Sequence, residues 1–326
     1  MSNVRVDIGI NSAFMTRRWE EPHSWVRIIK DLGFDVMSFD SDALDPFFSG
    51  NRDYVLQKAR QVKAEADAAG LTVSDYFTGY ASYRFFGLAH REAEQRRRMV
   101  EWMRGACEIA AAIGARGMGG RCDAYSVEVL ADASELKARY DGVISVWRDM
   151  AACAAALGLE AVYFEQMYVP SLIPYTIRQT YDYIRDCNVA LREGCVRPVV
   201  DLGHMCGQAY GSTGDDLLYE RWLEHFGAAC HVIHIQQTRR EASDHAPFSS
   251  GIRGNIEIET VLEALATSVR RAGEAEWAPY LDVPQRIYLI LEALPSTREC
   301  EDHLLDQMRE SNVYLRRAIP KGGILL

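Results

Sequence analysis

Eight short apolar runs, each followed by a longer segment with helical periodicity, most constrain how this chain can fold. The expected strands cover residues 6–10, 36–39, 72–77, 116–120, 160–165, 198–201, 231–235 and 287–292. The expected helices begin near residue 22 and then cover residues 53–69, 90–113, 133–157, 175–187, 215–226, 258–272 and 297–317. Alternating strands and helices indicate a parallel sheet, and eight such units in 326 residues fit one (β/α)8 TIM barrel of the α/β class.

A doubly wound parallel sheet is the alternative fold. It is disfavoured because no G-x-G-x-x-G motif follows the first expected strand. The glycine-rich run Gly117–Gly120 has neither that spacing nor a helix directly after it. Since no linker rich in Pro, Gly and Ser divides the chain, we expect residues 1–326 to form a single domain.

Charge and hydropathy indicate where in the cell the protein works and which classes of partner it can bind. The chain has 36 Lys and Arg against 46 Asp and Glu, and its net charge of −10 argues against binding to nucleic acid. It has no stretch of 18 apolar residues and no signal-peptide pattern at its N-terminus, so we expect no membrane span and no membrane partner. Its eight cysteines form no C-x-x-C motif, which is typical of reduced thiols in a cytoplasmic protein.

Four polar residues stand at or near the ends of consecutive expected strands: Glu165, Asp201, His234 and Glu292. In a TIM barrel the carboxyl ends of the strands meet at one mouth, where catalytic groups lie. Each residue alone also fits a helix cap or an ion-pair partner. Together, three carboxylates would repel one another unless a cation joined them. This oxygen-rich set suits Mn²⁺, Mg²⁺ or Co²⁺.

The sequence resembles the xylose-isomerase-like TIM-barrel superfamily, which includes the ketose 3-epimerases and sugar phosphate isomerases. The matching segments are Val162–Glu165, Val200–His204, His234–Thr238 with Arg240, and Leu289–Glu292. Within the superfamily the chain is most similar to the tetrulose-phosphate epimerases. That narrower likeness rests on Ile8–Asn11, Arg18–Trp19, Phe77–Gly79 and Asp244–Phe248.

The resemblance implies a divalent-metal-dependent isomerase or epimerase of a small ketose or ketose phosphate. Glu165, Asp201, His234 and Glu292 would bind one divalent metal, Mn²⁺ before Mg²⁺ or Co²⁺. The two glutamates would also act as the acid–base pair that removes and returns the proton α to the substrate carbonyl, through an enediolate. Arg240 would hold substrate oxygens. His204 would contact a substrate oxygen, or else cap the following helix.

Several positions leave alternatives open. His231 and His234 are three residues apart on a strand and point to opposite faces, so we assign His234 to the barrel interior. The second substrate-binding glutamate of the epimerases is replaced by Ser171. His245 is either an additional acid or base or a surface-loop residue.

Five further side chains are candidates for substrate binding. Arg121 either binds a substrate anion or pairs with Asp123. Four aromatic residues either form a wall of the sugar site or belong to the core: Trp19, Phe77, Tyr80 and Tyr168.

Other functions remain as alternatives. A lyase would use the same enolate, either on a 3-oxo-sugar, as in the C-glycoside deglycosidase α-subunit with its small β-rich second subunit, or as a keto-sugar-acid decarboxylase. An abasic-site endonuclease would need more strand-end histidines and a more basic surface. A non-catalytic sugar-binding barrel would have no need of four metal ligands.

The C-terminal tail, residues 318–326, is apolar and needs a surface to pack against. An apolar tail after a Pro-Lys-Gly-Gly break is not expected to stay in water. We expect it to dock on the barrel or on a partner subunit, and otherwise to fray. We also expect a homo-oligomer, which is common among enzymes.

Overall fold

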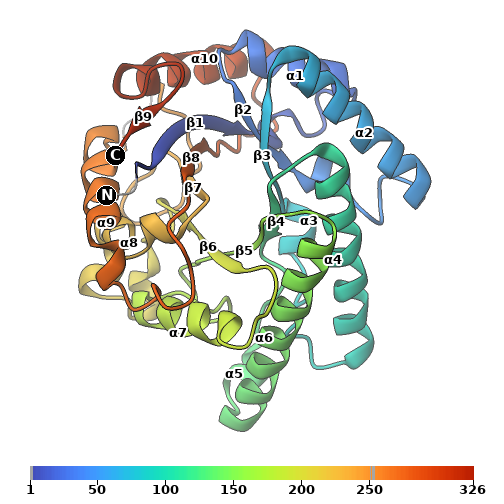
Figure 1. Ribbon diagram of the computed structural model, residues 1–326, viewed down its shortest axis with the longest axis vertical. Coiled ribbons are helices and arrows are strands. Elements are labelled where there is room, and N and C mark those ends of the chain that lie inside the picture. Colours follow the sequence, from blue (N-terminus) through green and yellow to red (C-terminus); the bar gives the residue numbers. More distant parts are fainter. Residues whose placement is uncertain (1–2, 250, 252–253) are drawn as a thin grey trace.

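The computed structural model describes residues 3–249, 251 and 254–326 and shows a closed barrel of eight parallel strands. The strands are β1 (Arg5–Asn11), β2 (Val36–Asp40), β3 (Thr72–Phe77), β4 (Gly117–Gly120), β5 (Ala161–Glu165), β6 (Val196–Asp201), β7 (Val232–Ile235) and β8 (Arg286–Leu291). Neighbours in sequence are neighbours in the barrel, and β1 pairs with both β8 and β2 to close it (Figure 1). The predicted TIM barrel is confirmed.

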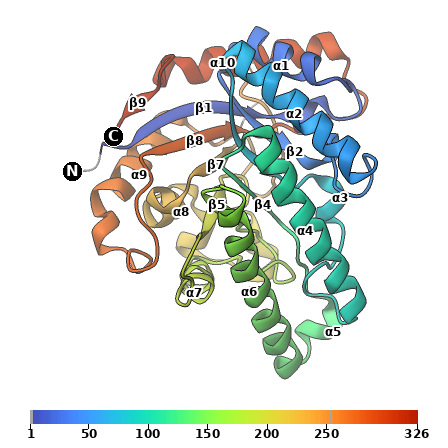
Figure 2. The same ribbon diagram turned by 45° about the vertical axis from the view of Figure 1, so that its right-hand side comes forward.

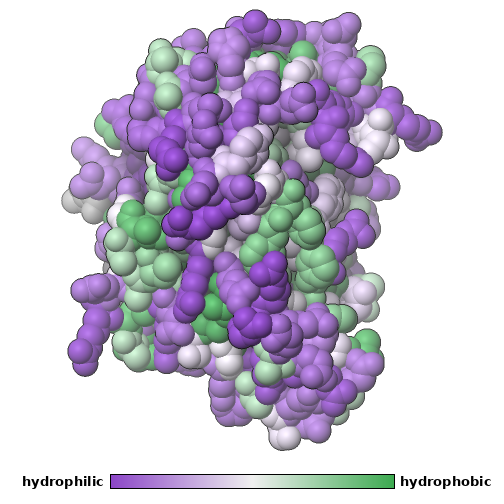
Figure 3. All heavy atoms as spheres, turned by 90° about the vertical axis from the view of Figure 1, so that its right-hand side faces the viewer, coloured by the Kyte–Doolittle hydropathy of each residue, from purple (hydrophilic) through white to green (hydrophobic). Residues whose placement is uncertain are grey.

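Helices surround the strands. The long ones are α1 (Pro22–Asp31), α2 (Arg52–Ala69), α4 (Ala93–Ile113), α6 (Ala133–Ala156), α7 (Ile177–Asn188), α8 (Tyr219–Phe226), α9 (Ile258–Arg271) and α10 (Glu301–Ala318). Figure 2 shows α2, α4 and α6 packed in succession along one side of the barrel. Figure 3 turns this side toward the viewer, and its surface is largely hydrophilic with separate hydrophobic areas. No helix in the described part of the chain is long and apolar enough to cross a membrane.

Local sequence signals set the helix ends. The side chain of Asn51 accepts a hydrogen bond from the Tyr54 backbone N–H and so begins α2, while Gly70, at φ +62°, ends it. Helix α10 begins at Glu301 rather than near residue 297, because residues 296–299 form a turn whose carbonyls accept hydrogen bonds from the Arg18 guanidinium. Helix α8 begins at Tyr219 rather than at 215, because residues 214–217 form a 3-10 turn.

The glycine-rich strand β4 is explained by close packing inside the barrel. A Cβ on Gly119 would lie 2.3 Å from the Cβ of Tyr163 on β5, and a Cβ on Gly120, at φ +123°, would lie 1.8 Å from the Thr78 hydroxyl. Both positions therefore require glycine. They bring the loop after β3 against the end of β4, close to the mouth of the barrel.

Two short helices were not expected from the sequence. They are α3 (Tyr80–Tyr83), in the loop after β3, and α5 (Val127–Leu130), in the loop after β4. A four-residue helix gives too little periodicity to be read from the sequence. Helix α3 matters most for function because it lies at the mouth of the barrel.

The C-terminal tail ends in a two-residue strand, β9 (Ile324–Leu325), which pairs antiparallel with β1. The tail docks at the amino end of β1, where β1 does not yet pair with β2; that pairing involves only Ile10 and Asn11. The apolar tail therefore contacts the chain's own barrel.

Candidate metal centre and acid–base site

The four strand-end residues meet at the mouth of the barrel. Glu165 and Asp201 are the last residues of β5 and β6, His234 lies on β7, and Glu292 directly follows β8. One ligand atom from each lies within 4.8 Å of the others, and all four residues are buried. Atoms that share one divalent ion at about 2.0–2.6 Å lie at comparable separations, so the arrangement has the dimensions of a metal site.

His234 lies at the centre of this group. Its Nδ1 is 3.2 Å from an oxygen of Glu165 and 3.2 Å from an oxygen of Glu292. Neither ring nitrogen has an aligned hydrogen-bond partner among the described residues, although the ring is fully buried. Burial would lower the pKa of His234, but the charges of Glu292 and Glu165 outweigh it and raise that pKa well above its usual value.

The donor set fits a divalent cation. Three buried carboxylates surround one imidazole, so the cluster needs positive charge between its ligand atoms. Carboxylate and imidazole donors without thiolate favour Mn²⁺, Mg²⁺ or Co²⁺ over a structural zinc site. The buried imidazole of His234, whose Nδ1 lies between two carboxylates without an aligned hydrogen bond, is the single observation that most favours a ligand in this position.

Two glutamines hold Asp201 in place. Gln236 donates from Nε2 to both carboxylate oxygens of Asp201, at 2.8 and 3.1 Å, and its Oε1 accepts the backbone N–H of His245 at 2.6 Å. Gln166 donates to the Asp201 carbonyl and accepts from the Asp201 backbone N–H. Such contacts orient ligands and tune the metal they hold. Gln236 in addition ties Asp201 to the loop that carries His245.

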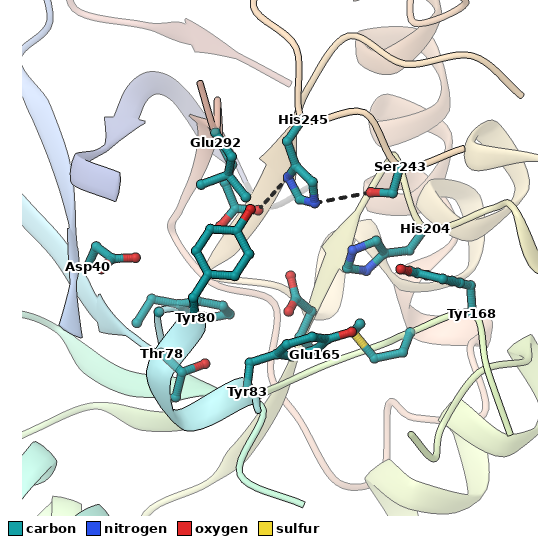
Figure 4. Close-up of a pocket in the computed structure, with 14 residues that line it drawn as sticks. Asp40, Thr78, Tyr80, Tyr83, Glu165, Tyr168, His204, Ser243, His245 and Glu292 are labelled. Carbon is teal, nitrogen blue, oxygen red and sulfur yellow. Dashed lines mark hydrogen bonds and ion pairs between the residues drawn. The ribbon is translucent and has the colours of Figure 1, made fainter. Parts of the chain in front are cut away.

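His245 reaches the mouth from the loop after β7. Its Nδ1 lies 3.3 Å from Glu292 Oε2, and its Nε2 lies 3.1 Å from the hydroxyl of Ser243 (Figure 4). Its backbone is left-handed, with φ +45°, a strained state that is often found at functional sites. Burial alone would lower the pKa of His245, but the hydrogen bond to Glu292 and the charge of Glu292 outweigh it and raise the pKa to about 9.

His204 faces His245 across the mouth, with ring centroids 5.9 Å apart. Its Nδ1 lies 2.8 Å from the Gln166 carbonyl, so Nδ1 carries the proton and donates it. The other nitrogen, Nε2, is 3.7 Å from Asp201 Oδ2 and is left to accept a hydrogen bond.

These residues border a cavity of about 230 Å³, which we call the metal-side cavity. Figure 4 shows Glu165, His204, His245 and Glu292 around it, with two tyrosines of α3, Tyr80 and Tyr83, opposite. The other side chains and backbone that line it are Asp40, Phe77, Thr78, Gly79, Met167, Tyr168, Ser243 and Leu294. Such a cavity, part polar and part apolar, has the size for a small sugar.

A family model confirms what the barrel and the strand-end residues indicate. The model of the xylose isomerase-like TIM barrel matches residues 26–270, well over half of the chain. The chain belongs to this family.

Sugar isomerases and epimerases are among the curated and solved proteins to which the chain is similar. The D-erythrulose 1-phosphate 3-epimerase of Brucella abortus (strain 2308) is 22% identical over 79% of this chain and 83% of that protein. A structure from Rhodospirillum rubrum, provisionally named a xylose isomerase, is 21% identical and covers 97% of this chain and all of that chain, with a TM-score of 0.81. D-psicose 3-epimerase from Clostridium cellulolyticum is 16% identical, covers 96% and 99% of the two chains, and has a TM-score of 0.65.

The structure brings most, but not all, of the sequence candidates to the mouth. Phe77 lines the metal-side cavity and packs edge-on against His234, with ring centroids 4.5 Å apart. Arg240 is exposed and lies outside the described lining of this cavity. Trp19 is half-buried against the hydrophobic core, also away from the lining.

Arg121 lies behind the mouth rather than in it. The side chain is 1% exposed, donates to the carbonyls of Glu165 and Ile173, and pairs with Asp123 at 3.2 Å. This geometry fits the alternative in which Arg121 and Asp123 pair together. Arg121 braces the backbone of Glu165 from behind.

Several functional candidates escaped the sequence analysis. Asp40 ends β2 and lines the cavity, so the strand-end rule that found the other carboxylates also applies to it. Tyr83 lies on α3, a helix too short to predict, whereas its neighbour Tyr80 was among the predicted aromatic candidates. Gln236 lies in the matching segment His234–Thr238, but its role was not predicted, because that role depends on the path of the loop to His245.

Proposed function

We propose that this protein is a metal-dependent epimerase or isomerase of a small ketose or ketose phosphate. The observation that carries the proposal is the meeting of Glu165, Asp201, His234 and Glu292 within one ligand sphere beside a sugar-sized cavity. These four residues would hold one divalent metal, for which Mn²⁺ is our first choice. When bound, the metal would polarise the substrate carbonyl and stabilise negative charge that develops on its oxygen.

The two glutamates are the proposed acid–base pair. They enter the cavity from β5 and β8, which are separated by two strands on the barrel wall, so they approach a substrate from different directions. One takes the proton α to the carbonyl and the other returns a proton to the opposite face. Each proton transfer needs a carboxylate within reach of the carbon, and the metal would stabilise the negative charge that the first transfer leaves on the carbonyl oxygen.

Two histidines, His234 and His245, set the protonation state of Glu292, one member of this acid–base pair. Burial would raise the pKa of Glu292, but the charge of His234 and the hydrogen bond from His245 hold it well below its usual value. Glu292 is therefore ionised, as both a metal ligand and a general base must be. We assign to His245 the exchange of a proton with Glu292, in whichever of the two steps Glu292 performs, and to His204 a hydrogen bond with a substrate hydroxyl.

A lyase is the second candidate. Ser171 stands where the epimerases carry their second substrate-binding glutamate, so the chain has lost one contact that holds a sugar for epimerisation. A lyase of a 3-oxo-sugar or a keto-sugar acid would start from the same α-proton abstraction. A lyase would then release part of the substrate as a separate product, whereas an epimerase keeps all of the substrate's atoms in one molecule.

The remaining proposals concern the setting of the enzyme. We propose a cytoplasmic homo-oligomer acting on a soluble sugar. The tail pairs with β1 of its own chain, and this contact favours a role within the subunit over the docking of a small second subunit.

The first experiment measures bound metal and proton exchange together. The protein is purified without chelator, and its metal content is compared with that of a Glu165→Gln plus Glu292→Gln variant. Four- to six-carbon ketoses and their phosphates are then incubated in D₂O and followed by NMR. We expect about one Mn, Co or Mg ion per chain, lost in the variant, and deuterium in the α-position of at least one ketose, with its epimer formed.

Gln57→Leu is a suitable control, because Gln57 is exposed on α2, away from the mouth. Absence of metal from both wild type and variant, or exchange that persists in the variant, would overturn the mechanism. Release of a fragment with no epimer would favour the lyase.

A further inference from the structure

A second cavity adjoins the metal-side cavity. It has a volume of about 570 Å³ and shares Asp40, Tyr80 and Leu294 with the metal-side cavity, so these residues lie between the two. The loop after β1 contributes Arg17 and Arg18 to it. The other contributions come from β2, from α3 and from the loop after β8.

Three arginines line this second cavity, which we call the arginine cavity: Arg17, Arg18 and Arg84. Their clustering is unusual for a chain with a net charge of −10. The guanidinium of Arg84 lies over the ring of Tyr80, 5.9 Å from its centroid, on the wall that the two cavities share. Guanidinium groups are the side chains that best match phosphate oxygens.

The backbone and the polar atoms of this loop also point to a ligand. Arg17 has a φ of +63°, a conformation that side chains other than glycine rarely adopt. Arg18 is fixed by hydrogen bonds from its guanidinium to the carbonyls of Ser296 and Glu299, both at 3.1 Å. The hydroxyl oxygen of Thr16 is buried with no hydrogen-bond partner among the described residues. A strained arginine, an anchored arginine and an unpaired hydroxyl thus meet in one cavity.

The carboxylates nearby cancel only part of this positive charge. Both oxygens of Asp42 already accept backbone N–H groups, from Tyr80 at 2.9 Å and from Ala81 at 3.1 Å. Burial and the charge of Asp42 raise the pKa of Asp40 well above its usual range, so Asp40 adds little negative charge. Asp42 offsets part of the charge of Arg17, and Glu301 pairs with Arg18 at 3.6 Å, so the excess positive charge at the cavity wall comes mainly from Arg17 and Arg84.

We infer that the arginine cavity binds the phosphate group of a phosphorylated ketose whose carbonyl end lies in the metal-side cavity. The inference rests on the proposed function and names its substrate class: a short ketose phosphate. Arg17 and Arg84 contact the phosphate, and Thr16 supplies a hydroxyl donor. The anchored Arg18 contributes charge from the side of the β8 loop.

The test compares each phosphorylated ketose with its unphosphorylated form in the metal-loaded enzyme, by the deuterium-exchange assay. Wild type is expected to prefer the phosphorylated form. In an Arg17→Gln plus Arg84→Gln variant, the ratio of kcat/KM for the two forms falls roughly 10- to 100-fold, the loss that follows from removing charged hydrogen bonds. Inorganic phosphate inhibits wild type competitively, and the variant loses this inhibition.

Arg309→Gln is the matched control, because this arginine is exposed on α10 and pairs only locally with Asp306. It is expected to keep the wild-type ratio. Equal use of phosphorylated and free ketoses by wild type would overturn the phosphate site while leaving the proposed function intact. Preference for a ketose carboxylate over the phosphate would also overturn it. A metal-loaded enzyme that exchanges no ketose in either form would instead overturn the proposed function.

Discussion

At the scale of single residues, the orientation of Asp201 depends on groups that do not themselves reach the substrate. Gln236 uses one amide group for two tasks: its nitrogen donates to Asp201 and its oxygen holds the backbone of His245. Loss of either contact would leave a buried polar group without a partner, and this costs more than the net value of a hydrogen bond. Gln236 therefore links Asp201, a proposed metal ligand, to His245, the proposed acid.

We predict that Gln236→Leu weakens metal binding about 10- to 100-fold, because a ligand loses its orienting partner. The free energy of unfolding should also fall by about 1–3 kcal/mol, because Asp201 and the His245 N–H lose a buried partner. Metal affinity is measured by calorimetric titration and stability by urea unfolding. Gln57→Leu, on the exposed face of α2, serves as the control. Unchanged metal affinity in Gln236→Leu would contradict the orienting role.

At the scale of elements, β9 completes an edge that the barrel leaves open. Strand β1 pairs with β8 over most of its length but with β2 only at its carboxyl end. The tail covers the free amino end of β1 through pairs that join Arg5 to Leu325 and Val6 to Ile324. An uncovered strand edge exposes backbone groups that promote association with other chains. The tail thus protects the barrel at the end opposite the mouth.

The two residues of β9 provide an internal comparison. Ile324 packs against the hydrophobic core, whereas the side chain of Leu325 is 60% exposed. We predict that Ile324→Ser lowers the free energy of unfolding by about 1–2 kcal/mol, the value of a partly buried aliphatic side chain, and that Leu325→Ser has almost no effect. Urea unfolding measures both. A large loss of stability or a change of oligomeric state in Leu325→Ser would show that the tail also meets a partner subunit.

At the scale of the whole molecule, the barrel and its four strand-end residues could be predicted because both follow from local periodicity. Each strand is a buried run, and a barrel brings every strand end to one mouth, so Glu165 and Asp201 are near each other whatever the loops do. The directions of loop side chains could not be predicted. Arg240 turns outward, and the backbone carbonyls that hold Arg121 come from β5 and the loop after it.

The floor of the barrel contains a titratable group that affects the stability of the whole fold. His231 is 4% exposed, and its Nδ1 lies 3.1 Å from the hydroxyl of Tyr163. Burial, together with the positive charges of Arg197 and Arg116, lowers the pKa of His231 well below its usual value of 6.5. The folded protein therefore keeps this imidazole neutral at a pH where the unfolded chain protonates it.

Linkage fixes the sign of the effect. As the pH falls below about 6.5, the His231 imidazole takes up a proton in the unfolded chain but stays neutral in the folded protein. The free energy of unfolding therefore falls by up to about 1.4 kcal/mol per pH unit. We predict that His231→Gln removes this part of the slope between pH 6.5 and 5.5, whereas His23→Gln, at an exposed position, keeps it. Urea unfolding at both pH values measures the difference. Equal slopes in wild type and His231→Gln would show that the imidazole takes up a proton without unfolding, through an opening of the barrel floor beside Tyr163.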